Sequence, residues 1–301
     1  MDRREFLTGA AAIAGLAGCN TVGSGGRSGK IKFGACVPFK KAALLKSIGY
    51  DYFEYAAALA LIPDKGEEEW KRKRDEIANL PLPIKACNGF LPGTFRLTGP
   101  NADFEPALKY AETVLRRAEE VGIEAIVFGS GGARNVPGDI TAKNAKDRPD
   151  TERGFEQYIE FCKILASRVS DLKTVEVVME PLRPNEANFL NYVWQGKIAC
   201  QEINSPRVRM LADLFHMMMG RESAESIVQA GPLLRHCHVA SYETRKYPGS
   251  DPSTVCRLKP YFDALKSIGY DRRVSCECGF ASGADEAKSF ETALTTLKGL
   301  A

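Results

Sequence analysis

Residues 151–181, "TERGFEQYIEFCKILASRVSDLKTVEVVMEP", combine a helical pattern with a strand pattern. Residues 151–171 place apolar side chains three and four positions apart, which is the period of an amphipathic helix. Residues 175–181 form a short apolar run rich in valine, typical of a buried strand. A similar run, "AIVFGS" (125–130), precedes the helix. Strand, helix and strand in this order predict a βαβ unit with parallel strands.

The same alternation continues along the chain from residue 30. The expected strands are 31–37, 50–56, 84–90, 125–130, 175–181, 208–214, 234–241 and 273–280. The expected helices include 67–80, 103–122, 151–171 and 258–270. Eight strands in about 270 residues predict a (β/α)8 TIM barrel. The alternative is an open doubly wound sheet, which usually carries a glycine fingerprint after its first strand. "GACVPFKKAALL" (34–45) lacks that fingerprint.

The first residues indicate export rather than part of the fold. "MDRREFLTGAAAIAGLAGC" (1–19) has a charged start, an apolar run too short to span a membrane, and small residues before Cys19. Arg3 and Arg4 resemble a twin-arginine export signal, and "LAGC" (16–19) resembles a lipobox. We therefore expect a signal peptide over 1–18, a flexible tether over 19–29 and one barrel domain over 30–301. The protein would lie on the periplasmic side, anchored by lipid on Cys19; a plain signal peptide without lipid is the alternative.

The amino-acid composition and the net charge limit which classes of partner are expected. The chain is 44% hydrophobic with a formal charge of +3, which suits a globular protein with one large core and is too small a charge to favour nucleic acid. The basic run "KRKRDE" (71–76) has acidic neighbours and reads as a solvated helix face. Nine cysteines raise the question of disulfides, but most lie inside apolar runs, where free cysteine behaves as a small buried hydrophobe.

Four ligand-type residues stand at the ends of the last four expected strands. Glu180, Asp213, His238 and Glu277 follow one another at intervals of 33, 25 and 39 residues, each about one βα unit. In a parallel barrel the carboxyl ends of the strands share one rim, where the active site lies. Each residue alone reads more simply as a helix cap, a surface charge or a satisfied polar group. The regular phasing favours a joint site.

Three carboxylates and one imidazole form a hard, oxygen-rich ligand set. Such a set suits Mn²⁺, Mg²⁺ or Co²⁺ better than a structural zinc site. Strand alternation places His236 on the same face as His238 but one layer deeper, and turns Cys276 and Cys278 away from Glu277. The C-x-C spacing is therefore not expected to bind metal.

Two further features have a functional and a simpler interpretation. The glycine-rich "GSGGARNVPG" (129–138) could cradle a phosphate with Arg134, but a tight βα loop explains the glycines as well, and we favour the loop. Glu54, at the end of its expected strand, faces a sugar or caps the next helix.

The sequence resembles the xylose-isomerase-like barrel proteins that include sugar phosphate isomerases and ketose 3-epimerases. The resemblance rests on "VVMEPLRPNEANFLN" (177–191), "LADLFHM" (211–217), "HCHVASYETRKYPG" (236–249) and "FDALKSIGYDRRVSCECGF" (262–280). It implies that Glu180, Asp213, His238 and Glu277 bind the metal. It also implies that Glu180 and Glu277 move the proton, and that Glu186, His216 and Arg245 contact the sugar. Arg245 is offset by about one position from the epimerase pattern. Having only three histidines argues against the DNA-repair branch of the family.

The resemblance implies a divalent-metal-dependent isomerase or epimerase that removes a proton next to a sugar carbonyl, with Mn²⁺ as the expected ion and Mg²⁺, Co²⁺ or Zn²⁺ as alternatives. A metal-dependent lyase or dehydratase acting on a keto-sugar or keto-glycoside would use the same site. A sugar-binding lipoprotein without catalysis is a third reading. The particular sugar and the oligomeric state stay open.

Overall fold

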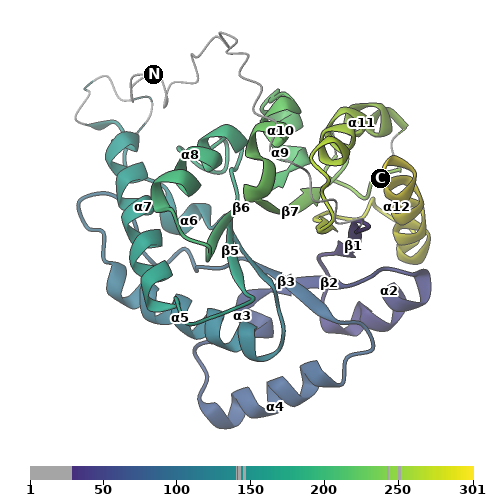
Figure 1. The fold of residues 1–301 in the computed structure, drawn as a ribbon, viewed down its shortest axis with the longest axis horizontal. Helices are drawn as coiled ribbons and strands as arrows, with labels where there is room; N and C mark the ends of the chain where they lie inside the picture. Colours follow the sequence, from purple (N-terminus) through teal and green to yellow (C-terminus); the bar gives the residue numbers. More distant parts are fainter. Residues whose placement is uncertain (1–28, 140, 142–143, 145–146, 243, 250–251) are drawn as a thin grey trace.

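Eight parallel strands line the centre of the molecule, with helices around them (Figure 1). The computed structural model describes residues 29–301 except 140, 142–143, 145–146, 243 and 250–251. The predicted signal peptide, Cys19 and all of the predicted tether but its last residue lie outside that range. The strands are β1 (Lys32–Ala35), β2 (Phe53–Ala56), β3 (Ile84–Asn88), β4 (Ala125–Phe128), β5 (Glu176–Met179), β6 (Val208–Asp213), β7 (Leu234–Val239) and β8 (Arg273–Cys276). Each lies within one of the eight stretches predicted as strands.

The sheet closes on itself. Its order is β1-β8-β7-β6-β5-β4-β3-β2, with every neighbouring pair parallel. The two end strands meet through a bridge between Cys36 and Glu54, where the backbone N–H of Val37 donates to the carbonyl of Glu54 at 2.9 Å. The (β/α)8 barrel is therefore confirmed, and the open doubly wound sheet is excluded.

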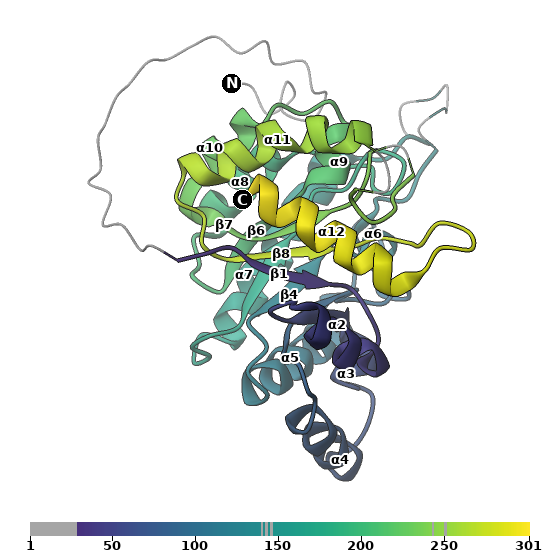
Figure 2. The ribbon, with the colours of Figure 1, turned by 90° about the vertical axis from the view of Figure 1, so that its right-hand side faces the viewer.

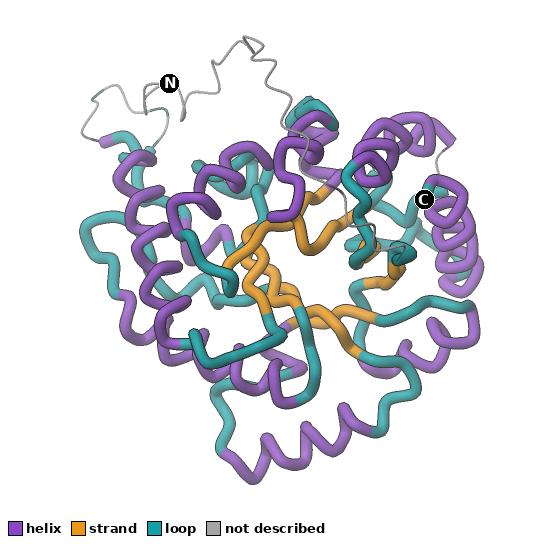
Figure 3. Tube along the Cα trace, in the orientation of Figure 1, coloured by secondary structure: helices purple, strands orange, loops and turns teal. Residues whose placement is uncertain are grey.

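Helices follow the strands and surround them (Figure 3). They are α2 (Ala42–Ile48), α3 (Ala57–Ala60), α4 (Glu67–Ala78), α5 (Phe104–Glu120), α6 (Gly131–Arg134), α7 (Thr151–Arg168), α8 (Val193–Ile203), α9 (Leu214–Met219), α10 (Glu225–Ala230), α11 (Pro252–Ser267) and α12 (Glu286–Leu300). Figure 2 turns the barrel so that α12 lies in front, over β8 and β1. The helix expected over 258–270 is α11, which begins earlier, at Pro252, and contains Pro260.

The barrel interior is filled by a layer of buried side chains from alternate positions of the strands. Five of them form one cluster together with Ala125, and none is more than 1% exposed: Tyr52, Ala86, Val127, Val178 and Leu211. Side chains two positions further along a strand point to the same face. The residues at those positions are Glu54, Asn88, Gly129, Glu180 and Asp213. The packed layer thus forms the floor beneath a polar layer at the carboxyl ends of the strands.

The eight described cysteines are free thiols, and five of them are buried. Within the described ranges, no helix is both long enough and apolar enough to cross a bilayer.

Candidate metal centre and active site

Glu180, Asp213, His238 and Glu277 converge at the carboxyl ends of β5 to β8. Each offers one ligand atom, and the four atoms all lie within 4.8 Å of one another. Glu180 directly follows β5 and Glu277 directly follows β8, while Asp213 ends β6 and His238 is the penultimate residue of β7. The four residues predicted to act together are therefore adjacent in space.

The imidazole of His238 is held from below by Glu54. His238 is fully buried, and its Nε2 lies 3.0 Å from Oε1 of Glu54. Its Nδ1 lies 3.3 Å from Oε1 of Glu180 and 3.8 Å from Oε2 of Glu277. A proton on Nε2 satisfies Glu54 and leaves the Nδ1 lone pair facing the carboxylates. This is the usual carboxylate–histidine arrangement beside a metal.

Glu54 lies deeper than the sequence suggested. It is fully buried, and its second oxygen lies 2.8 Å from Nε2 of His236, one layer below His238. It does not cap the following helix, since α3 has no side-chain cap. The structure therefore places Glu54 beneath the rim, with both of its oxygens engaged by histidines.

Burial and neighbouring charges shift the pKa values of four residues here: Glu54, His236, His238 and Glu277. Burial alone would raise the pKa of Glu54, but His238 and His236 lower it well below its usual value. Burial lowers the pKa of His236 to about 4. Burial also acts to lower the pKa of His238, but the carboxylates of Glu54, Glu277 and Glu180 raise it well above the usual value. Burial raises the pKa of Glu277, and the neighbouring Glu180 and Asp213 add to this, while His238 and Arg245 oppose it.

Asp213 is fixed by the helix that it starts. Its Oδ1 accepts the backbone N–H of Phe215 at 2.7 Å and of His216 at 3.3 Å, which caps α9. Its Oδ2 lies 3.5 Å from Nε2 of His216. Because Oδ1 caps α9, Oδ2 remains available as a metal ligand beside Glu180, His238 and Glu277. We call these four residues the ligand group.

The carboxylate of Glu180 fits in its position because Gly129, which directly follows β4, has no side chain. A Cβ on Gly129 would lie 2.4 Å from Oε2 of Glu180. The loop that follows is held by Arg134, which is fully buried and donates to the carbonyls of Gly129 at 2.7 Å and of Phe189 at 2.6 Å. Arg134 therefore holds the loop together and does not offer its charge to a phosphate, as the simpler interpretation of the glycines expected.

Glu186, His216 and Arg245 lie at the same rim. Arg245 donates from Nη2 to Oε2 of Glu277 at 2.7 Å and from Nη1 to Oε1 of Glu186 at 3.2 Å. Its backbone has a positive φ of 51°, a conformation that L-residues seldom adopt. His216 is 2% exposed, and neither ring nitrogen has a hydrogen-bond partner among the described residues. Buried polar atoms without a partner are uncommon and mark a position where a ligand group would be accepted.

The sequence did not single out two further residues of this site, Asn88 and Arg183. Asn88 donates to Oε1 of Glu277 at 3.3 Å. Arg183 donates to Oε1 of Glu186 at 2.7 Å, and its guanidinium lies over the ring of Phe215, 5.2 Å from the ring centre. A single sequence gives no signal that Asn88 of β3 contacts Glu277, which follows β8. Arg183 stands in the quoted motif but resembles any loop arginine.

The ligand group fits a divalent cation of the hard type. Three carboxylates confined within a few ångströms in a buried site repel one another unless a cation or a proton lies among them. Carboxylate oxygens with one imidazole are the donors that Mn²⁺ and Mg²⁺ prefer. Glu180, Asp213, His238 and Glu277 are the residues that would hold the ion.

Comparison with known proteins places this architecture in a family. Residues 42–299 match the family described as xylose isomerase-like TIM barrel, and the chain belongs to it. The chain is 30% identical over 176 residues to a ketose 3-epimerase from Arthrobacter globiformis. That alignment covers 58% of this chain and 57% of the relative, so the chain spans little more than half the length of the curated relative that it matches.

Two solved structures share the fold over nearly their whole length. D-psicose 3-epimerase from Clostridium cellulolyticum H10, crystallised with D-tagatose, superposes with a TM-score of 0.72 at 18% identity, covering 90% of this chain and 98% of that one. The 3-keto-D-glucoside 4-epimerase from E. coli superposes with a TM-score of 0.70 at 20% identity, covering 90% of this chain and all of the other. At this identity the likeness establishes the fold.

Proposed function

We propose that the protein is a divalent-metal-dependent isomerase or epimerase that acts on a sugar or keto-sugar by removing a proton next to a carbonyl. The observation that carries the proposal is the convergence of Glu180 and Glu277 with Asp213 and His238 within 4.8 Å. The similarity to a ketose 3-epimerase over about half of the chain supports a ketose as substrate. Mn²⁺ is the ion that we expect, with Mg²⁺, Co²⁺ or Zn²⁺ as alternatives.

Glu180 and Glu277 are the proposed acid–base pair. They follow strands separated by two others in the sheet order, so they approach the centre of the barrel mouth from different directions. A sugar lying between them would have one carboxylate on each face. One would take the proton from carbon and the other would return a proton from the opposite side. A bound divalent ion would polarise the substrate carbonyl and make this carbon more acidic.

Glu277 is held in a defined orientation and can be reached from solvent. Arg245 and Asn88 each donate to a different oxygen of Glu277 and fix its plane. Its side chain is 25% exposed, so an incoming sugar can reach it.

Substrate hydroxyls would be held by the rim residues. The partnerless nitrogens of His216 and the carboxylate of Glu186, 3.9 Å from one of them, are the proposed sugar contacts, together with Arg245. Because Arg245 and Arg183 share Oε1 of Glu186, its position is well defined before a substrate binds. Defined donors and acceptors reduce the entropy lost on binding.

We also propose that the protein is exported, cleaved before Cys19 and lipidated there, so that the barrel works on the periplasmic side of a membrane. The support is the order of charged, apolar and small residues in 1–19. Mass spectrometry of the N-terminal peptide from membrane fractions tests this directly. An unmodified N-terminus beyond residue 19 would overturn it.

The experiment that tests the reaction is incubation with a panel of ketoses and 3-keto-glycosides in D₂O, after loading with Mn²⁺. An isomerase or epimerase gives a deuterated sugar of unchanged composition, with the label next to the carbonyl. A lyase gives a product that has lost a substituent. A binding protein gives saturable binding with no label in any sugar. The first result supports the proposal, and either of the others contradicts it.

A further inference from the structure

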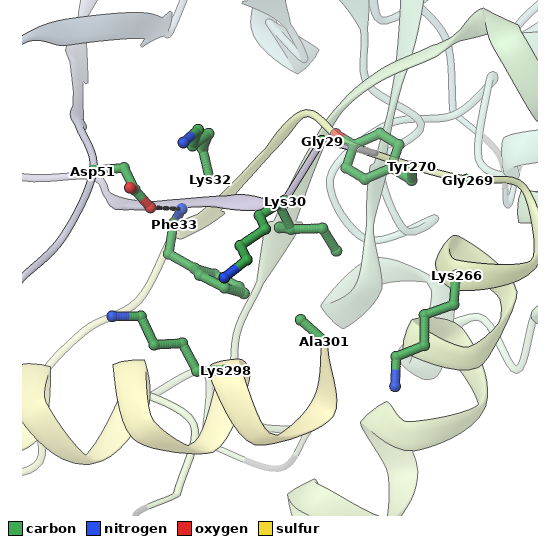
Figure 4. Close-up of a pocket in the computed structure, with 11 residues that line it drawn as sticks. Gly29, Lys30, Lys32, Phe33, Asp51, Lys266, Gly269, Tyr270, Lys298 and Ala301 are labelled. Carbon is green, nitrogen blue, oxygen red and sulfur yellow. Dashed lines mark hydrogen bonds between the residues drawn. The ribbon is translucent and has the colours of Figure 1, made fainter. Parts of the chain in front are cut away.

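A cluster of lysines lies at the end of the barrel opposite the candidate site. A hollow of about 810 Å³ is framed by Lys30 and Lys32 at the start of β1, Lys266 near the end of α11 and Lys298 near the end of α12. Figure 4 shows these side chains around it. All four lysines are exposed. Residues before β1 and β8 line the hollow, and therefore it opens at the amino ends of the strands. The Glu180 and Glu277 site opens at the carboxyl ends.

The positive charge of this surface, which we call the basic face, is only partly compensated. Lys30, Lys32 and Lys266 have no ion pair among the described residues, and Lys298 contacts only the carbonyl of Gly49, at 3.4 Å. Two carboxylates lie nearby. Asp51 accepts the N–H of Phe33 at 2.9 Å, and Asp271 lies against Gly29. Arg272, beside Asp271 in the adjoining depression, adds a further positive charge.

The chain enters the barrel at this face. Gly29 lines the hollow, and Cys19 precedes it by ten residues. Ten residues reach at most about 35 Å when fully extended. A lipid on Cys19 would therefore keep the membrane within about 35 Å of Gly29 at the edge of the hollow.

We propose that the basic face rests on the anionic headgroups of the membrane surface, so that the mouth of the active site points away from the bilayer. Lipid phosphates are attracted by clustered lysines near the surface, an attraction that falls off within a Debye length of about 10 Å at 0.1 M salt. The inference rests on the proposed lipid attachment for its setting, but the attraction between the basic face and anionic lipid does not require the lipid. Orientation by this face leaves the Glu180 and Glu277 rim open to sugars from solution.

The test measures binding of the full chain with Cys19→Ser, which cannot be lipidated, to vesicles. One set of vesicles is phosphatidylcholine and the other contains about one-third phosphatidylglycerol. The neutral vesicles measure any binding by the apolar segment 7–17. We expect at least about tenfold tighter binding to the anionic vesicles, lost in about 0.5 M salt. Equal binding to both sets would overturn the proposal.

Two matched triple variants locate the surface. Lys30→Gln, Lys266→Gln and Lys298→Gln together remove three charges from the basic face. Lys71→Gln, Lys163→Gln and Lys288→Gln remove three charges from exposed positions on α4, α7 and α12. The first variant should lose most of the preference for anionic vesicles, and the second should keep it within about twofold. Equal losses in both would show that only net charge matters and would contradict the proposal.

A last experiment distinguishes binding to a lipid surface from binding of a free anion. Inorganic phosphate at a few millimolar should leave vesicle binding unchanged, because a single phosphate does not reproduce an array of headgroups. If phosphate displaced the protein while an equal ionic strength of chloride did not, the basic face would be a site for a small anion and the proposal would fail. None of these readouts depends on turnover or on lipid at Cys19. Failure here is thus distinct from failure of the proposed reaction or of the proposed export.

Discussion

Glu54 lies directly beneath His238, with its Oε1 3.0 Å from Nε2 of the imidazole. The other carboxylate oxygen is engaged by His236 at 2.8 Å. All three side chains are fully buried. When a metal ion occupies the site, this arrangement favours the tautomer with the proton on Nε2, held by Glu54, and leaves Nδ1 to bind the ion.

Glu54→Gln should weaken metal binding. Glutamine is neutral and has a single acceptor oxygen for two histidines, so it holds the Nε2 proton of His238 more weakly and makes the imidazole a poorer metal ligand. We expect the dissociation constant for Mn²⁺ to rise about 10- to 100-fold. Titration against a competing chelator measures it. Glu76→Gln, on the exposed surface of α4, is the matched control, and an unchanged constant for Glu54→Gln would contradict this role.

Gly129→Ala should displace Glu180 without unfolding the barrel. The added methyl group would lie 2.4 Å from Oε2 of Glu180, so the carboxylate must move. A shift of this size in a reacting group should cost at least about 100-fold in kcat. Gly66→Ala is the control, because its Cβ would lie 3.5 Å from the nearest atom. Wild-type kcat in the Gly129 variant would show that Glu180 need not occupy its observed position.

Arg134→Met should destabilise the protein strongly. The guanidinium is fully buried and donates to the carbonyls of Gly129, Phe189 and Glu180. Methionine leaves these acceptors without partners, and the free energy of unfolding should fall by at least about 3 kcal/mol. Arg153→Met, on the exposed side of α7, should change it by less than about 0.5 kcal/mol. Urea denaturation at neutral pH compares the two, and similar values would contradict the structural role.

Glu222 should make stability depend on pH. It is buried beside the start of α8 and accepts the N–H groups of Val193 and Trp194. Burial raises its pKa to about 7, against about 4.3 for an unfolded chain. Between these values the folded protein holds the proton more tightly than the unfolded one. The contribution of Glu222 to stability is therefore greatest below pH 4 and is lost as the pH rises through 7.

The measurement is the free energy of unfolding from pH 5 to pH 8. The wild-type value should fall across this range by about 1–3 kcal/mol more than that of Glu222→Gln. Glu225→Gln, at an exposed position of α10, should keep the wild-type slope. If the Glu222 variant kept that slope as well, the buried carboxyl would not be the titrating group.

Local patterns predicted the barrel and its ligand group because both depend on periodicity. The apolar runs located every strand, and the period of two placed His236 beneath His238 and turned Cys276 away from Glu277. The pairing of Glu54 with the histidines was not predictable, since β2 and β7 meet only across the closed barrel. The same holds for Asn88 with Glu277. The contact of Arg245 with Glu277 was not predictable either, since the chain reaches it through a backbone with a positive φ that the sequence does not reveal.

Glu277 is proposed to move a proton at the sugar carbon as one half of a two-carboxylate pair. The most direct measurement is the rate at which Glu277→Gln, loaded with Mn²⁺, forms the deuterium-labelled epimer of the preferred ketose in D₂O, compared with wild type. The amide keeps the shape of the side chain but cannot take or return the proton on its face, whereas Glu180 can still exchange a proton on the other. We expect formation of the labelled epimer to fall by about 10²- to 10⁴-fold while Mn²⁺ and sugar still bind. Formation of that epimer at the wild-type rate, with metal bound, would contradict this role.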